Sequence, residues 1–182
     1  SLNKNFVWLK RHITPNQYQQ IINLGEIYIR THKEKKRIYP FKNIPSHIVG
    51  YVNIDQKGQS GVERFFDSEL SKSKNIYLTL DINLQQMVRR NLIETINNYR
   101  AESGLAVLME IKNGNILSSV SYPDFNPENK NTYLEQNLIN RVIQSNFEMG
   151  STFKPITAAM GYDLNIIDPQ MKFDVKKKFN GI

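Results

Sequence analysis

The chain has 182 residues, of which 40% are hydrophobic, so it is long enough for one modest domain or two small ones. It contains no cysteine, which excludes disulfides, thiolate metal sites and cysteine nucleophiles, and its three histidines lack metal-ligand spacing, so we expect neither a metal nor a cofactor. The formal net charge is +7, and the longest apolar run, over 105–109, is far too short to span a membrane.

For the first 75 residues, the sequence predicts short helices and strands, and its apolar residues follow no regular period. Thr14 followed by Pro15 starts a helix, and apolar residues at helical spacing carry it to Gly25. A residue before a proline avoids helical backbone, so 37–40 should be extended. The remaining predictions in this part are a strand over 48–52, a helix over 62–70 and a polar linker over 71–75.

The pattern is sharper after residue 75. Asp81 is a helix N-cap candidate, and an apolar stripe follows it to about Arg100. An Asn-Gly pair at 113–114 is a strong hairpin signal, which predicts strands over 105–111 and 116–121. The other elements predicted are a strand over 76–80, a helix over 133–143 and a helix that begins at Ser151.

The most informative stretch for function is Gly-Ser-Thr-Phe-Lys-Pro at 150–155. On a helix, Ser151 and Lys154 lie one turn apart on one face, so a nucleophile stands beside a possible base. Pro155 has no N–H and deprives the Ser151 carbonyl of its usual donor, which fits a helix whose first turn starts there. The same Ser-x-x-Lys spacing recurs twice elsewhere, so an ordinary helix start with a surface lysine is the simpler interpretation of the spacing alone.

Several stretches, taken in order, carry a resemblance to a known family. They are Phe6-Val7-Trp8-Leu9-Lys10-Arg11; Arg37-x-Tyr39-Pro40, His47-x-x-Gly50-Tyr51-Val52, Asp55, Gly58, Gly61-Val62-Glu63 and Phe66-Asp67; Leu78-Thr79-Leu80-Asp81 with Leu84-Gln85; Ala101-Glu102-Ser103-Gly104 through Asn113-Gly114 to Tyr122-Pro123-Asp124-Phe125-Asn126-Pro127; and Asn140-Arg141 with Gly150-Ser151-Thr152-Phe153-Lys154-Pro155. On these residues the chain resembles class B penicillin-binding proteins, the bacterial cell-wall transpeptidases, and looks closest to the division-specific type. The resemblance spans nearly the whole chain and favours a catalytic role for Ser151.

The resemblance implies an α+β chain of two parts. Residues 1–70 would belong to the pedestal, the elongated N-terminal domain that holds the catalytic domain off the membrane. Residues 76–182 would be the N-terminal portion of the transpeptidase domain. That domain shares its fold with serine β-lactamases, an antiparallel sheet with helices on both faces, and the predicted hairpin would supply its first two strands.

The resemblance also implies a mechanism. Ser151 would be the nucleophile that attacks the D-Ala-D-Ala carbonyl of a peptidoglycan stem peptide, and Lys154 the general base that accepts its proton. An amine from a neighbouring strand would release the acyl-enzyme as a crosslink, whereas a β-lactam would stay on Ser151. The implied partners include a membrane glycosyltransferase and other division proteins. An anchor upstream of this chain would hold the protein at the bacterial inner membrane, with its soluble part in the periplasm.

Two departures from the family pattern bear on this assignment. Met149 occupies a position where the family usually has proline. The fold also needs a Ser-x-Asn and a Lys-Thr-Gly after the nucleophile, yet no serine follows Ser151 and no Lys-Ser/Thr-Gly occurs in the chain. We therefore expect a transpeptidase domain that is incomplete within this chain, is not competent alone and has an unpaired edge on its hairpin.

Two other classes of function are left open. One is a non-catalytic pedestal or interaction module of the cell-wall synthesis machinery, in which the Ser151 helix serves only for packing. The other rests on basic clusters over 33–37 and 176–178, which could attract nucleic acid or an anionic membrane surface. A solvated basic surface is simpler, and aromatic residues are not interleaved with these clusters as stacking on bases requires, so we expect no nucleic-acid partner.

Overall fold

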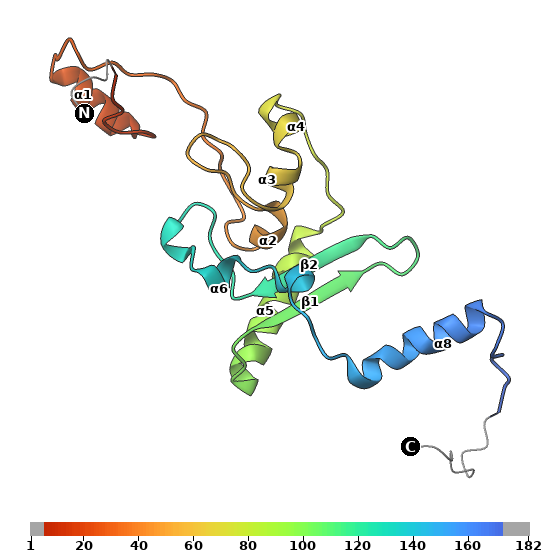
Figure 1. Ribbon diagram of the computed structural model, residues 1–182. Helices are drawn as coiled ribbons and strands as arrows, with labels where there is room; N and C mark the ends of the chain where they lie inside the picture. Colours follow the sequence, from red (N-terminus) through yellow and green to blue (C-terminus); the bar gives the residue numbers. More distant parts are fainter. Residues whose placement is uncertain (1–5, 173–182) are drawn as a thin grey trace. The chain divides into compact units, whose positions relative to one another are not determined.

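The computed structural model describes residues 6–172, and the chain divides into two compact units, one up to Gln144 and one from Ser145 onward (Figure 1). The first unit holds helices α1 to α7, the short helix η1 and a two-stranded sheet, and the second holds η2 and α8. Each unit is described by itself. Within residues 6–172, no helix is both long and apolar enough to cross a bilayer.

Helix α1 (Pro15–Asn23) confirms the first predicted helix. Thr14 caps it, because its side chain accepts a hydrogen bond from the Gln17 N–H while the Gln17 side chain accepts one from the Thr14 N–H. Pro15 is well placed at the first helical position, where an N–H would have no partner within the helix. The local start signal in the sequence is therefore sufficient for this helix.

The strand predicted over 48–52 is wrong. The segment begins instead in the short helix α2 (Ser46–Val49), and Val52 makes an isolated β-bridge. Gly50 ends the helix with a φ of +81°, and a Cβ there would lie 1.9 Å from the carbonyl oxygen of Ser60. This close approach of two backbone segments requires glycine and bends the chain where a strand would have to continue.

The helix predicted over 62–70 forms as two short helices, α3 (Gly61–Phe65) and α4 (Asp67–Ser71). They meet at Phe66, whose φ of −105° and ψ of 27° are not helical. The prediction is thus correct in type and wrong in continuity. Of the segment 37–40 predicted to be extended, residues 37–39 lie outside helices and strands, whereas Pro40 begins a turn.

Helix α5 (Ile82–Tyr99) confirms the longest predicted helix. The Asp81 carboxylate caps it by accepting hydrogen bonds from the N–H groups of Asn83 and Leu84, at 2.8 and 3.1 Å. Arg100 ends it in the left-handed region, with a φ of 52°. Both ends fall within a residue of the positions that the sequence predicts.

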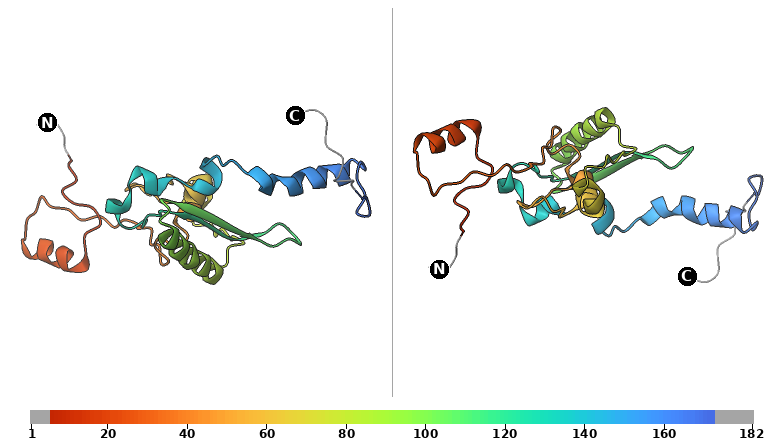
Figure 2. Two further views of the ribbon diagram at one scale, coloured as in Figure 1. Left: turned by 90° about the horizontal axis from the view of Figure 1, so that it is seen from below. Right: turned by 90° about the horizontal axis from the view of Figure 1, so that it is seen from above.

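Strands β1 (Gly104–Met109) and β2 (Ile116–Tyr122) form the predicted antiparallel hairpin, in register from Gly104 opposite Tyr122. Helix α5 lies along one face of the hairpin (Figure 2). A Cβ on Gly104 would come within 3.0 Å of the Ile96 side chain of α5, so glycine permits this close packing. Helices packed against an antiparallel sheet agree with the predicted α+β class.

The strand predicted over 76–80 is wrong. This segment runs past the outer edge of β2 and is tied to it by the Thr79 hydroxyl, which donates to the Ile116 carbonyl at 2.7 Å, and by the Asp81 N–H. These bonds do not form a ladder. Further along β2, the side-chain amide of Gln85 takes the place that a neighbouring strand would have.

The helix predicted over 133–143 is wrong as a continuous element. The elements of this part are η1 (Lys130–Thr132), α6 (Glu135–Leu138) and α7 (Arg141–Gln144). Ser121 on β2 explains the break between α6 and α7. Its hydroxyl donates to the Ile139 carbonyl at 3.1 Å and accepts from the Arg141 N–H at 3.0 Å, so tertiary hydrogen bonds replace helical ones.

The core of the first unit is largely polar. The buried hydrophobic side chains are Tyr39, Ile96, Val120 and Phe125, and the buried polar or charged ones are Ser46, Glu63, Gln85, Ser118, Ser119, Ser121 and Asn140. Glu63 is paired with Arg37, with 2.8 Å between Oε1 and Nε. Because buried polar groups need partners, specific hydrogen bonds as well as apolar packing decide how this unit assembles.

Candidate active site

The Ser-x-x-Lys pair lies at the start of the helical stretch of the second unit. The short helix η2 (Gly150–Phe153) holds Ser151, and α8 (Lys154–Asp163) begins with Lys154. Gly150 has a φ of +51°, in the left-handed region that glycine adopts without strain. The structure thus places both predicted residues in the first turns of one helical stretch.

Pro155 shapes this helix start. Because it has no N–H, it cannot donate to the Ser151 carbonyl four residues earlier. The Lys154 N–H donates to that carbonyl instead, which gives the first turn its 3-10 geometry. Met149 precedes the turn with a φ of −70°, a value that proline also adopts, and its carbonyl accepts a hydrogen bond from the Thr152 hydroxyl. Methionine in place of the usual proline therefore leaves the backbone of this entry compatible with either residue.

Ser151 and Lys154 are both exposed in the second unit, taken by itself. The apolar side chains along α8 are also accessible: Phe153, Ile156 and Met160 are 48%, 47% and 52% exposed. At the far end, a Cβ on Gly161 would lie 2.8 Å from the Ile167 side chain, so the chain folds back tightly against α8. The geometry of this unit supplies a hydroxyl and an amine on one helical turn, beside an apolar helix surface.

In the first unit, the sequence marks Gln85 only as part of a family motif and does not predict its structural role. It is 1% exposed, and its amide donates to the carbonyls of Ile44 and Ser119 while its oxygen accepts from the Ser118 hydroxyl and the Ser119 N–H, at 2.8 to 3.1 Å. The available signal was its helical spacing from the buried Ile96, which puts a glutamine in line with the inward face of α5. Gln85 joins the segment around residue 44 to the hairpin.

Asp124, in the loop after β2, is the second polar centre of this unit. The Arg89 Nε donates to its carboxylate at 2.6 Å, and the Asn43 amide donates at 3.1 Å. The Asp124 side chain is only 8% exposed, so this ion pair is largely shielded from water. The network fixes α5, the loop and residue 43 to one another, which is a structural role.

An aromatic cluster closes the same region. It consists of His47, Tyr51, Phe125 and Tyr133, whose ring centroids lie 4.6 to 5.7 Å apart. Nε2 of His47 is 2.9 Å from the Asn137 carbonyl. Burial lowers the pKa of His47, and burial raises the pKa of Tyr133 to about 12, so both groups stay neutral at physiological pH. Among residues 6–172, no group of three or more His, Asp or Glu side chains is arranged to hold a metal ion.

Comparison with known proteins gives a consistent family. The family described as the penicillin-binding protein transpeptidase domain matches residues 104–181, a span that includes Ser151 and Lys154. The probable peptidoglycan D,D-transpeptidase PbpC of Pseudomonas aeruginosa is 30% identical over 85% of this chain and 32% of that protein. Two proteins named peptidoglycan D,D-transpeptidase FtsI are also similar: that of Buchnera aphidicola is 30% identical over 97% of this chain and 36% of that protein, and that of Escherichia coli 28% identical over 89% and 32%.

A solved structure shows the same likeness. The crystal structure of a putative peptidoglycan glycosyltransferase from Atopobium parvulum matches with a TM-score of 0.63 at 29% identity, over 76% of this chain and 35% of that one. The chain is thus similar to the penicillin-binding protein transpeptidase domain and to peptidoglycan D,D-transpeptidases, which confirms the resemblance that its sequence motifs predict. It spans about a third of the length of the curated relatives it matches.

Proposed function

We propose that the protein of which this chain is part is a peptidoglycan D,D-transpeptidase, with Ser151 as nucleophile and Lys154 as general base. The observation that carries the proposal is the match of residues 104–181 to a transpeptidase domain, because this span contains both residues. Their placement on one helical turn supports it. The substrate is a stem peptide that ends in D-Ala-D-Ala.

The reaction proceeds in two steps. Ser151 Oγ bonds to the carbonyl carbon of the penultimate D-Ala, its proton passes to the Lys154 amine, and the terminal D-Ala leaves with a proton as the peptide bond breaks. An amine of a second stem peptide then attacks the ester carbon and loses a proton, and the Ser151 oxygen regains one as the ester breaks. The positive end of the helix dipole at the start of this stretch favours the negative charge that develops on reacting oxygens. A β-lactam follows the first step by opening its ring amide, and the resulting ester stays on Ser151.

The finer parts of the proposal are its setting and its partners. The resemblance to the division-specific type supports a role in cell division, with a membrane glycosyltransferase and other division proteins as partners. An anchor upstream of this chain would place the catalytic part in the periplasm. The division of the chain into a pedestal over 1–70 and a transpeptidase portion over 76–182 belongs to the same proposal.

Covalent labelling of the full-length protein tests the proposal. We expect a fluorescent penicillin to add one adduct per molecule, detectable by intact mass, and Ser151→Ala to abolish it. Ser71→Ala is the matched control, because Ser71 is an exposed serine with the same Ser-x-x-Lys spacing and should leave labelling unchanged. Lys154→Ala should slow acylation by roughly 10²- to 10⁴-fold, the usual contribution of a general base. Persistent labelling of the Ser151→Ala protein would contradict the assignment of Ser151 as the nucleophile.

A second candidate function is an interaction module of the cell-wall synthesis machinery. The exposed aromatic and basic surface of residues 6–36 favours it. This alternative is non-catalytic, with the Ser151 helix serving only for packing, so it requires no reaction at Ser151. A pull-down that requires residues 6–36 and tolerates Ser151→Ala would support the interaction module.

A further inference from the structure

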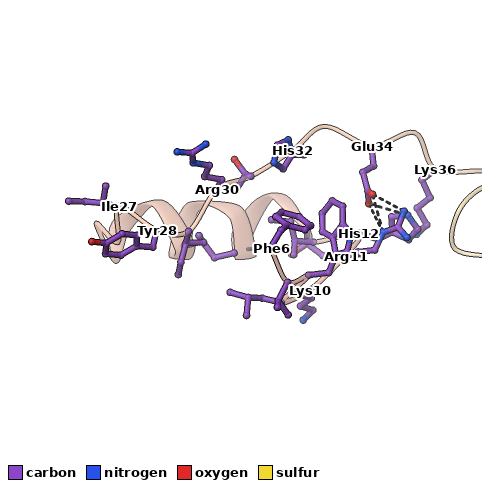
Figure 3. A pocket seen from close by; sticks show the side chains of 18 residues that line it. Phe6, Lys10, Arg11, His12, Ile27, Tyr28, Arg30, His32, Glu34 and Lys36 are labelled. Carbon is purple, nitrogen blue, oxygen red and sulfur yellow. Dashed lines mark hydrogen bonds and ion pairs between the residues drawn. The ribbon is translucent and has the colours of Figure 1, made fainter. Parts of the chain in front are cut away.

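We propose that residues 6–36 form a groove that binds an extended acidic segment of a partner protein by accepting it as an additional β-strand. The groove has a volume of about 1050 Å³, at the upper end of the roughly 300–1,000 Å³ usual for ligand pockets. It is lined by two non-helical segments, 6–14 and 27–36, and by Ile21 of α1 (Figure 3). The proposal is independent of the transpeptidase reaction.

Unpaired backbone groups are the first argument for a strand. In the part of the chain that the structure describes, no backbone-to-backbone hydrogen bond involves residues 7–13 or 30–36, and both segments lie outside helices and strands. Exposed backbone donors and acceptors in an extended segment are a template for another chain. A peptide that adds to such an edge gains affinity from main-chain hydrogen bonds.

At the end of the second segment, over 32–36, side chains that line the groove alternate with side chains that do not. Arg30, His32, Glu34 and Lys36 line the groove, as Thr31 does, whereas Lys33 and Lys35 do not. Figure 3 shows the four lining residues following one another along the segment. A period of two is the spacing of extended backbone, so residues 32–36 have the side-chain spacing that strand addition requires.

Aromatic side chains supply apolar contacts for the ligand. The rings of Phe6, Trp8 and His32 meet edge-on, with centroids 5.1 to 6.4 Å apart. Trp8 is 49% exposed and Tyr28 is 94% exposed, so both are available to a partner. In the sequence these aromatics are not interleaved with the basic cluster, but the fold brings them to the same groove.

Charge selects an acidic ligand. Residues 6–37 carry seven Lys or Arg against two Glu. Of these two, Glu34 is already held by Arg11, at 2.8 Å, and Arg11 also contacts Asp55 at 2.6 Å. The exposed lining cations Lys10, Arg30 and Lys36 therefore leave the groove positive, which attracts carboxylates and repels basic segments.

A bound peptide strand explains these observations better than an anionic membrane surface does. A bilayer would attract Lys33 and Lys35 as strongly as Lys36, since long-range charge does not distinguish neighbouring positions. It would also leave the backbone groups of 30–36 unpaired. A segment that alternates acidic and apolar residues matches the cations, the aromatic rings and the free backbone together.

Fluorescence of the whole chain gives a direct assay, because Trp8 is its one tryptophan. The probe is a synthetic peptide of about eight residues, within the usual length of a strand, that alternates glutamate and valine. We expect saturable binding with a blue shift of the Trp8 emission. A peptide that alternates lysine and valine tests charge, and a glutamate-valine peptide with alternate backbone nitrogens methylated tests main-chain pairing.

Two double variants distinguish binding in the groove from general attraction to positive charge. Arg30→Glu with Lys36→Glu reverses two lining cations and should weaken binding roughly tenfold or more, since one exposed ion pair is worth up to about a fivefold change. Lys33→Glu with Lys35→Glu makes the same change in net charge on the same segment and should alter affinity less than about twofold at physiological salt. Circular dichroism checks that both variants keep their fold.

Three outcomes would overturn the proposal. They are equal weakening by the two double variants, undiminished binding of the methylated peptide, and a Trp8 response only to phosphatidylglycerol vesicles or to an oligonucleotide. Penicillin labelling of Ser151 does not enter this assay. Failure of the groove proposal is therefore distinguishable from failure of the transpeptidase proposal.

Discussion

Replacing Gln85 by methionine keeps the length of the side chain and removes its four hydrogen bonds. The Gln85 amide pairs with both the N–H and the carbonyl of Ser119, at 2.8 Å each, in the manner of a neighbouring strand. It also reaches the Ile44 carbonyl and the Ser118 hydroxyl. The side chain is fully buried, so water cannot take over these bonds without rearrangement.

The expected loss of stability follows from the groups left behind. A buried polar group without a partner costs about 1–3 kcal/mol. The Ser118 hydroxyl can rotate and each carbonyl retains a second lone pair, so the Ser119 N–H is the group most severely affected. We expect Gln85→Met to lower the free energy of unfolding by about 2–5 kcal/mol, a large part of the 5–15 kcal/mol that a domain usually has.

Urea denaturation followed by circular dichroism measures this loss, with Gln86→Met as the control. Gln86 is the exposed neighbour on the same helix, and a surface change of this kind stays within about 0.5 kcal/mol. Hydrogen exchange should show faster exchange of the Ser119 amide in the Gln85 variant alone. Equal unfolding midpoints for the two variants would refute the reasoning, because they would mean that the buried amide contributes no net stability.

Two further predictions concern the same unit. Gly50→Ala should unfold the region around α2, since a Cβ there would lie 1.9 Å from the Ser60 carbonyl, whereas Gly25→Ala, at a similar positive φ but in open space, should cost only about 1–2 kcal/mol in thermal unfolding. Burial lowers the pKa of His47 below 6.5, the value in the unfolded chain. The contribution of neutral His47 to stability is therefore fully present above about pH 6.5. It is lost as pH falls below this value, because the unfolded chain takes up the proton first. His47→Gln should therefore flatten the dependence of the urea midpoint on pH below about 6.5, and an unchanged slope would contradict this.

The elements that the sequence predicts correctly are those with complete local signals. Helix α1 has Thr14 as its cap, and α5 has Asp81. The hairpin has an Asn-Gly pair at its turn, where Gly114 takes a φ of +76°. In each case one or two residues fix the backbone at an element's end, so neighbouring residues suffice to specify it.

The incorrect predictions share a different cause. Apolar, β-branched residues at 48–52 and 76–80 have the composition of strands, but neither segment forms a hydrogen-bonded ladder with another strand in the described part of the chain. Position 133–143 has helical composition, but hydrogen bonds from Ser121 break it at Ile139. Tertiary contacts determine the secondary structure of these segments, and local propensity does not include such contacts.

At the candidate site, too, the sequence predicts the features that depend on neighbouring residues. The effect of Pro155 on the Ser151 carbonyl follows from covalent chemistry, and the helix start has the expected form. Helical spacing from Ile96 predicts that Gln85 faces inward, but the four partners of its amide could not be predicted, because they come from segments distant in the sequence. The groove was hidden as well, since its aromatic and basic residues meet only in the fold.

The polar character of the first unit bears on how its parts work together. Residues before position 71 are tied to residues after position 75 by directional bonds: the Tyr39 N–H donates to Glu128 at 3.1 Å, and His47 Nε2 lies 2.9 Å from the Asn137 carbonyl. Directional bonds fix orientation as well as contact, whereas an apolar interface permits sliding. Residues 37–67 therefore form one hydrogen-bonded body with α5 and the hairpin, and all of them lie in the first compact unit.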